Sequence, residues 1–436
     1  MFHLSLLASA YPIQTACAGV FAYGVGYVGE YSDNIGRTPT NPQDEWINSA
    51  IAGITYRENG ATLDANLMAQ AEYRDYKYDT YKDGPLYYAD ASFLWRVSPQ
   101  RLNWVFVDRY DQVTRNITLA NTPDNMVGAN VLSTGPDFFI RLGSVNTLLI
   151  GLRYGNASYS EGDLDNSRYS AMASWQYASS RDLTYSLNYR GEQTKYENEV
   201  LNDNSMRNDL FFRADMRQVH TQFLLDLGTT HIDRDRAGEA HGYIARLTWA
   251  QQLTTESAAG VLLASEFLDA GAALLATATN PVLATGTGTT SSLPASGEVT
   301  NDLYYTKRAE AYYDHTGSSV VVNTRIFIRD IDYEIVPQDR QEAGGRMQIS
   351  YNLSRLLAAT LYGSYVDIRY QNIVREDRES DAGLRFLYRS SSNLSVALEG
   401  RKTWHYSTDA LQEFIDRRVL LSLLYSTSPL FTTARR

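Results

Sequence analysis

The sequence predicts an all-β protein, a transmembrane antiparallel meander barrel of about 18–20 strands. Three observations lead to this prediction. Apolar and polar residues alternate along most of the chain, and tight turns alternate with longer polar connectors. Tyrosine is also unusually frequent, with 32 Tyr against 14 Phe and 6 Trp. No run of apolar residues reaches the length of about 18 that a spanning helix needs, which excludes a helical membrane protein.

Residues 166–192 illustrate the alternation, because two alternating runs flank a short turn at 179–182. Every second residue of these runs is apolar or aromatic: Tyr169, Ala171, Ala173, Trp175 and Tyr177, then Leu183, Tyr185, Leu187 and Tyr189. A period of two indicates strands whose two faces meet different media. Aromatic rings near the ends of the apolar face suit membrane–water interfaces, so we interpret this segment as a membrane hairpin with its turn on the periplasmic side. Composition alone fits a soluble tyrosine-rich β-sandwich or propeller equally well.

The N-terminal residues 1–18 are typical of a secretion signal. An apolar stretch from Leu4 to Ala10 precedes Ala16-Cys17-Ala18, which fits a small-residue cleavage site before Gly19. Only His3 stands where a basic region is expected, and Gln14 stands where a lipoprotein signal prefers leucine. Lipidation of Cys17 is the alternative interpretation. As the single cysteine, Cys17 allows no internal disulfide and no zinc site built from several cysteines.

From Gly19 onward, twenty segments have the pattern of strands, each long enough for the roughly 9–11 residues that a tilted strand needs to cross a bilayer. They cover residues 19–31, 46–57, 61–74, 85–97, 101–115, 128–142, 146–158, 166–178, 182–195, 206–217, 219–232, 240–252, 256–267, 302–314, 318–331, 343–353, 355–370, 380–390, 393–406 and 416–427. Gly135-Pro136 interrupts one of them, and a proline marks a bulge or weakens a strand assignment, so eighteen strands is the alternative count.

Two classes of connector alternate between these segments. Tight turns rich in Gly, Asn, Ser and Pro lie at 58–60, 98–100, 143–146, 316–317 and 390–393. Longer polar connectors lie at 32–45, 75–84, 116–127, 159–165, 196–205, 233–239, 268–301, 332–342, 371–379 and 407–415. Short turns at one rim and long loops at the other are typical of outer-membrane barrels, whereas a sandwich would have Greek-key crossovers. Closure follows because unpaired edge groups are costly in hydrocarbon.

The predicted barrel spans residues 19–427, with a long loop at 268–301 and a C-terminal tail at 428–436. The loop consists mainly of Ala, Thr, Gly, Ser and Leu and carries almost no charge. It either folds into or over the pore or forms a flexible surface excursion, and the second interpretation is favoured.

The alternation assigns residues to two faces of the barrel. The expected lipid face holds Leu148, Ile150, Leu152, Tyr154, Phe223, Leu225, Leu227, Met347, Ile349, Tyr351, Leu353, Leu384, Phe386, Tyr388, Val419, Leu421, Leu423 and Tyr425. The expected lumen face holds Arg153, Arg168, Arg190, Arg213, Arg246, Arg308, Arg325, Arg346, Arg385, Arg401 and Arg418, with Glu192, Asp209, Asp215, Asp226, Glu310 and Glu399 between them. The arginines either bind a hydrated or anionic polymer or pair with the carboxylates and stiffen the wall; for any single arginine we favour pairing.

No pattern points to catalysis, a cofactor or a metal, so we expect a protein that is not an enzyme. The histidines are His3, His220, His231, His241, His315 and His405, and none has the HExxH spacing of a zinc site. His231 and His241 flank one expected external loop, which is weak evidence for a metal. His405 near Ser407 is the best candidate for a hydrolase pair, and chance explains it well. A net charge of −11 argues against a nucleic-acid partner.

Residues 23–57, YGVGYVGEYSDNIGRTPTNPQDEWINSAIAGITYRE, resemble the putative β-barrel porin 2 family. The resemblance rests on a first strand, the Tyr31–Ile35 segment, a Thr-Pro segment, an acidic residue and a second strand with a central Gly-Ile. Ala52 departs from it where a proline is expected, and the chain continues as SPLFTTARR after Tyr425, where outer-membrane strands commonly end on an aromatic residue.

The resemblance implies a barrel in the bacterial outer membrane, surrounded by lipid and lipopolysaccharide, that passes exopolysaccharide outward with a periplasmic export lipoprotein as partner. Two alternatives remain open. One is a general diffusion porin for small solutes, and the other is a structural or surface-docking barrel with a plugged lumen.

Overall fold

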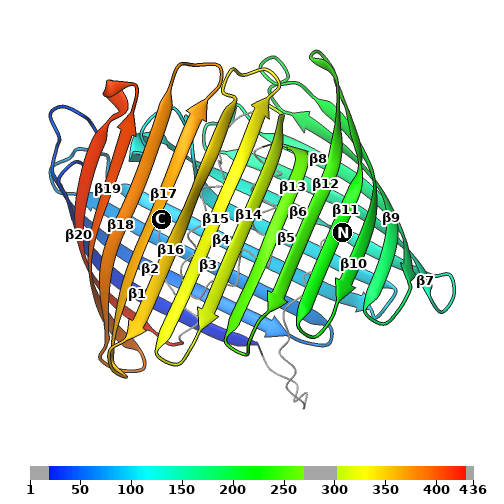
Figure 1. Cartoon of the computed structure of the whole chain (residues 1–436), viewed down its shortest axis with the longest axis horizontal. Helices are drawn as coiled ribbons and strands as arrows, with labels where there is room; N and C mark the ends of the chain where they lie inside the picture. The colour runs from blue at the N-terminus through cyan, green and yellow to red at the C-terminus, as the bar shows by residue number, and fades with distance from the viewer. Residues whose placement is uncertain (1–18, 270–301, 429–436) are drawn as a thin grey trace.

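A computed structural model describes residues 19–269 and 302–428 as one closed antiparallel barrel (Figure 1). Each strand pairs with its neighbours in sequence, and the last strand pairs with the first, so the sheet has no free edge along its circumference. Among the described residues, no helix is long and apolar enough to cross a membrane. The predicted signal at 1–18, nearly all of the loop at 268–301 and nearly all of the tail at 428–436 lie outside the described residues.

The described residues form twenty strands, which confirms the larger predicted number and corrects the alternative of eighteen. The strands are β1 Val20–Ser32, β2 Glu45–Asn59, β3 Leu63–Tyr76, β4 Gly84–Ser98, β5 Leu102–Thr114, β6 Met126–Arg141, β7 Asn146–Tyr159, β8 Asn166–Ala178, β9 Leu183–Tyr196, β10 Ser205–Arg217, β11 Thr221–Arg234, β12 Gly238–Gln252, β13 Ser257–Leu268, β14 Tyr304–Thr316, β15 Val320–Tyr333, β16 Arg340–Asn352, β17 Leu357–Tyr370, β18 Glu376–Arg389, β19 Leu394–Ser407 and β20 Phe414–Ser426. Two 3₁₀ turns, η1 Pro123–Asn125 and η2 Ala410–Gln412, lie in loops.

Strand β6 remains continuous despite Gly135-Pro136. Ladder pairing with β7 stops at Thr134 and resumes at Asp137 in the same register, so the proline interrupts pairing locally without ending the strand. Glycine is required beside it, because a Cβ at position 135 would lie 2.0 Å from the carbonyl oxygen of Leu152. Because glycine has no Cβ, β6 can pass this close to the backbone of β7 and remain part of the barrel wall.

The long connectors lie at one rim and the short turns at the other (Figure 1). Both ends of the barrel lie at the short-turn rim, where the backbone N–H of Thr427 donates to the carbonyl of Tyr23 at 2.9 Å. Several long connectors are shorter than predicted, among them those expected at 332–342, 371–379 and 233–239. The expected loop at 233–239 is a three-residue turn at 235–237, closed by Gly238 with φ of 77°. The strands β11 and β12 therefore extend further than their alternation indicates.

The two faces follow the alternation. Along β20, Val419, Leu421 and Leu423 are exposed on the outside, and the residues between them turn toward the lumen. Buried apolar side chains gather instead inside the long-loop rim, where strand ends meet loops. One such cluster joins Ile35, Ile47 and Tyr76, with Tyr81 packed against it. The middle of the lumen wall is polar, and this is where charged side chains meet.

Candidate functional site

The lumen face of five neighbouring strands, β10 to β14, carries a connected series of ion pairs. Arg213 on β10 forms a bidentate pair with Asp226 on β11, at 2.6 and 2.7 Å. Arg246 on β12 lies 3.3 Å from the same carboxylate and 2.5 Å from Glu266 on β13. Glu266 in turn lies 3.7 Å from Arg308 on β14. Asp226 is fully buried beneath these guanidinium groups, so its charge depends on them for compensation.

A second network lies on β8 and β9. Arg168 is buried between Glu192, at 3.7 Å, and Asp269, which it holds through two hydrogen bonds of 2.6 and 3.0 Å. Arg190 also pairs with Glu192. Asp269 directly follows β13, so this contact ties the start of the β13–β14 connector to a wall strand that is five positions away in the sheet. No pattern in the sequence indicates that partner.

A third network lies on β14 to β16 near the long-loop rim. Arg329 lies 3.4 Å from Glu310 and 3.7 Å from Glu342. Arg340, which is 1% exposed, donates to Glu342 at 2.8 Å and to the Tyr333 hydroxyl at 3.1 Å. Each guanidinium is therefore held by groups from the same or neighbouring strands.

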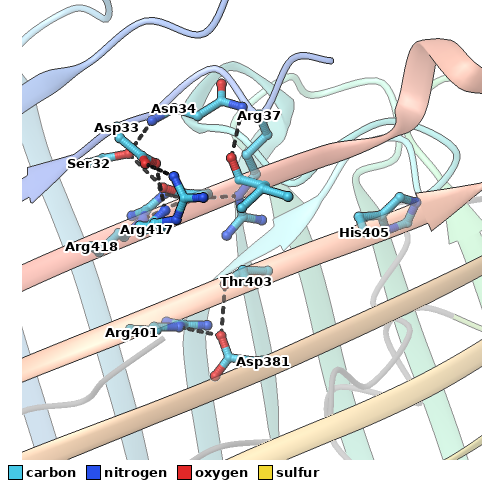
Figure 2. A network of polar contacts seen from close by, with 12 residues as sticks. Ser32, Asp33, Asn34, Arg37, Asp381, Arg401, Thr403, His405, Arg417 and Arg418 are labelled. Carbon is cyan, nitrogen blue, oxygen red and sulfur yellow. Dashed lines mark hydrogen bonds and ion pairs between the residues drawn. The ribbon is translucent and has the colours of Figure 1, made fainter.

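A fourth network joins β18, β19, β20, β1 and the loop 33–44 (Figure 2). Arg418 bridges the barrel seam, at 2.7 Å from Glu30 and 2.6 Å from Asp416. Arg401 and Thr403 both donate to Asp381, at 2.5 and 2.8 Å. Arg37 reaches from the loop to within 3.6 Å of Asp416. Burial and the nearby charge of Arg418 lower the pKa of Arg37.

Near the short-turn rim the lumen face forms a polar groove. Within it Arg217 pairs with Asp215 at 2.7 Å; on the neighbouring strands β6 and β7, outside the groove, Arg153 donates to Asp137 at 2.8 Å. The groove is lined by guanidinium, carboxylate, hydroxyl and amide groups, from Gln176, Arg181, Asp182, Thr184, Ser186, Asn188, Arg213, Asp215 and Arg217. Such a mixed lining can exchange hydrogen bonds with a hydrated solute without holding one charge strongly.

The remaining predicted residues also occupy the lumen face. Arg325 lies 4.0 Å from Asp314, Asp209 accepts from Arg207, and Glu399 accepts from the Tyr362 hydroxyl at 2.7 Å. Arg346 and Arg385 alternate with the outward Met347 and Leu384 and so face inward. The prediction omitted several carboxylates that follow the same alternation, among them Glu30, Asp137, Glu266, Asp314, Glu342, Asp381 and Asp416. Applying the period of two to every strand would have found them.

One loop crosses the mouth of the barrel. The β5–β6 loop, residues 115–125, places the carbonyl of Thr118 where Arg375 in the β17–β18 loop donates to it at 2.7 Å. The shorter way round the sheet, from β18 through β20 and β1 to β6, is eight strands, so the two loops belong to facing walls. Asn125 holds the loop in shape by donating to the carbonyls of Asn116 and Ala120. We call residues 115–125 the strap.

The Ser407 and His405 side chains do not form a nucleophile–base pair. Both lie on the lumen face of β19, and the Ser407 hydroxyl donates to Asp377 at 2.6 Å. His405 lies 3.7 Å from Asp377 and 3.8 Å from Glu379, and its ring stacks on Phe414 at a centroid distance of 5.3 Å. The two side chains thus share a carboxylate within the wall.

A closed barrel of this size, with an apolar outer face and an ion-paired lumen, is a porin-like β-barrel of the outer-membrane class. The family model for putative beta-barrel porin 2 matches residues 342–426, which run from β16 to β20. This match confirms the resemblance to that family noted at residues 23–57, on a different stretch of the chain. No curated protein matches the sequence.

Solved structures that align with most of the chain include three proteins of Pseudomonas aeruginosa. A mutant of the ferric enterobactin receptor PfeA is 10% identical with a TM-score of 0.48, over 94% of this chain and 81% of that one. OccK2 (OpdF) is 10% identical with a TM-score of 0.39, over 94% and 98%. The siderophore receptor PirA is 13% identical with a TM-score of 0.43, over 93% and 80%.

Proposed function

We propose that this barrel lies in the bacterial outer membrane and forms a conduit for hydrated polar molecules, with exopolysaccharide as its exported cargo. The observation that carries the proposal is the connected set of ion pairs on the lumen face of β10 to β14. A wall of this kind is wetted, and its charges are already compensated by one another.

Compensation of the charges determines how cargo would interact with the wall. An unpaired arginine would hold an anionic polymer tightly, and conduction requires binding that is weak enough for release. The Arg213–Asp226–Arg246–Glu266 series offers many partly engaged donors and acceptors instead. Sugar hydroxyls can exchange with these groups one at a time, so a polymer would move along the wall without a deep energy minimum. The proposed role involves transport alone and no chemical reaction.

The direction and identity of the cargo come from the family resemblance. It implies outward passage of exopolysaccharide, with a periplasmic export lipoprotein at the short-turn rim and lipopolysaccharide around the barrel. A general diffusion porin would have the same wall chemistry. A plugged structural barrel is favoured by one observation, the strap across the mouth.

Deletion of the gene in the native host tests the export role. We expect surface polysaccharide to fall and polymer to accumulate in the periplasm, and expression of the wild-type chain to reverse both changes. If surface polysaccharide is unchanged and uptake of small sugars is slower, the export role is contradicted and the general diffusion role is supported. Unchanged polysaccharide and unchanged uptake would contradict both transport roles.

A further inference from the structure

The tip of the β11–β12 hairpin stands beyond the part of the sheet that its neighbour β13 reaches. Strand β12 pairs with β11 along its whole length, to the rung Arg234–Gly238. Its pairing with β13, in contrast, begins at Gln252 and ends at Ala245–Ser265. Beyond that rung β13 leans inward, and Phe267 packs against Ile232 and Ala240 on the lumen side. The outer face of the hairpin tip is therefore open on one side.

Two histidines lie directly opposite each other on this open face. His231 on β11 and His241 on β12 form one rung, two residues beyond the rung Thr229–Tyr243. His231 alternates with Leu225 and Leu227, so both rings stand on the outside of the barrel. Their Nδ1 atoms are 2.9 Å apart, and the rings stack with centroids 4.4 Å apart at 24°. The sequence places these residues on either side of one hairpin loop, and the structure shows that they are direct partners in the ladder.

A carboxylate lies beside the other nitrogen of each ring. His231 Nε2 is 3.2 Å from Asp233, and His241 Nε2 is 3.3 Å from Glu239. These carboxylates favour the tautomers that carry hydrogen on Nε2, as in carboxylate–histidine–metal arrangements. Both Nδ1 atoms would then present lone pairs to each other at hydrogen-bond distance. Two facing lone pairs repel unless a proton or a cation lies between them.

We propose that His231 and His241 bind a divalent first-row transition ion such as Zn²⁺ through their Nδ1 atoms at the outer face of this hairpin tip, with Glu239 orienting the His241 ring at Nε2 and water completing the coordination. The candidate ligand atoms of the three residues all lie within 4.8 Å of one another. Tetrahedral zinc with Zn–N bonds of about 2.0–2.1 Å separates two nitrogen ligands by roughly 3.3 Å, close to the observed spacing. The stacked rings must open for both lone pairs to converge, which the broad χ2 torsion of histidine permits.

The donor set also determines which ions compete. Imidazole nitrogen suits Zn²⁺, Cu²⁺ and Ni²⁺, whereas Mg²⁺ and Ca²⁺ prefer sites made of oxygen ligands. A bound ion would cross-link β11 and β12 where β12 has lost its β13 partner, and would hold the hairpin tip in place. This site stands apart from the lumen, so it does not depend on the proposed conduit.

Zinc titration of the purified, tag-free barrel in detergent, followed by calorimetry, tests the site. We expect saturable binding of one Zn²⁺ per chain and no binding of Mg²⁺ at the same concentration. His231→Gln and His241→Gln should each weaken zinc binding at least about tenfold, as expected for loss of a ligand. His220→Gln is the matched control, because His220 lies exposed in the β10–β11 turn at the opposite rim and should leave affinity unchanged.

Heat modifiability on gels verifies that each variant is folded before titration. Wild-type affinity in the double variant His231→Gln/His241→Gln would overturn the proposal, as would an equal loss of affinity in His220→Gln. Absence of saturable zinc binding to the folded wild-type barrel would overturn it as well.

Discussion

At the scale of single residues, the main feature of the lumen is that its arginine charges are neutralised by nearby carboxylates. On β8 to β14 each arginine of the lumen face lies within 4.0 Å of a carboxylate, often one on the neighbouring strand. Taking a charge partly out of water is costly unless it is paired and hydrogen-bonded. Pairing across strands meets that requirement and joins adjacent strands by their side chains.

Asp226→Asn tests this compensation at its most buried member. The substitution leaves Arg213 and Arg246 with one carboxylate fewer, so we expect the free energy of unfolding to fall by about 2 kcal/mol, below the 3–5 kcal/mol for fully buried pairs because both guanidinium groups touch water. The lumen also loses one negative charge, which should shift reversal potentials toward anion selectivity. Urea unfolding in liposomes and bilayer recordings measure these effects.

Asp44→Asn provides the control for that variant, since Asp44 is exposed in the β1–β2 loop. It should change neither stability nor selectivity. Equal effects from the two variants would mean that the ion pairs on the wall contribute nothing specific.

The sequence predicts the face of a residue well and its partner poorly. Alternation assigns Arg213 and Asp226 to the lumen because a strand has a period of two. Their contact depends on the register of β10 against β11, which pairs Arg213 with Asp226 directly. The Arg168–Asp269 and Arg375–Thr118 contacts depend on loop paths, and no local pattern encodes those.

At the scale of strands, the outer face provides the interaction with lipid. Leu421 lies near the middle of β20 and is exposed, while its neighbour Leu420 faces the lumen. Lipid-facing arginine at the bilayer midplane costs roughly 2–4 kcal/mol. The two adjacent leucines therefore face different media: Leu421 faces lipid, and Leu420 faces the polar lumen.

Leu421→Arg should therefore destabilise the barrel by about 2–4 kcal/mol or prevent its assembly into liposomes. Leu420→Arg is the matched control, since its side chain enters a polar lumen beside Glu399 and Glu30. Folding yield and urea midpoint measure both variants. A smaller loss for Leu421→Arg than for Leu420→Arg would reverse the assignment of the two faces.

Strand existence was predictable because each strand is long and strongly patterned. Both ends of all twenty described strands lie within four residues of the prediction. The error at 233–239 has a physical cause. Asp233, Arg234, Glu239 and Gly238 are polar or small, as in a loop, yet they continue the β11–β12 ladder as far as the turn. Polarity there indicates water around the strands rather than the end of the strands.

At the scale of the whole molecule, closure depends on the β1–β20 seam. Nine rungs join the strands, from Gly24–Ser426 to Ser32–Arg418, and Arg418 and Asp416 bridge them by side chains. Val28 and Ser422 are paired on the lumen side of this seam. Directly opposed residues in an antiparallel ladder are close enough for a disulfide.

Val28→Cys/Ser422→Cys in a Cys17→Ser background should form a disulfide that joins the two ends of the barrel. The heat-unfolded oxidised chain should migrate faster on non-reducing gels, and reduction should abolish the difference. Val28→Cys/Leu420→Cys, two residues out of register, should not cross-link, because diagonal partners are about 7–8 Å apart. Equal cross-linking in both variants would contradict the seam register.

Single-channel conductance in planar bilayers tests the central claim, a water-filled polar conduit, most directly. The account predicts discrete conductance steps for the wild-type barrel, with larger steps or fewer closures in Arg375→Ala, which releases the far end of the strap. Arg389→Ala, at the short-turn end of β18, should behave as wild type. If neither the folded wild-type barrel nor the folded Arg375→Ala variant conducts ions, the proposed conduit is contradicted. The remaining interpretation is then a plugged, structural barrel.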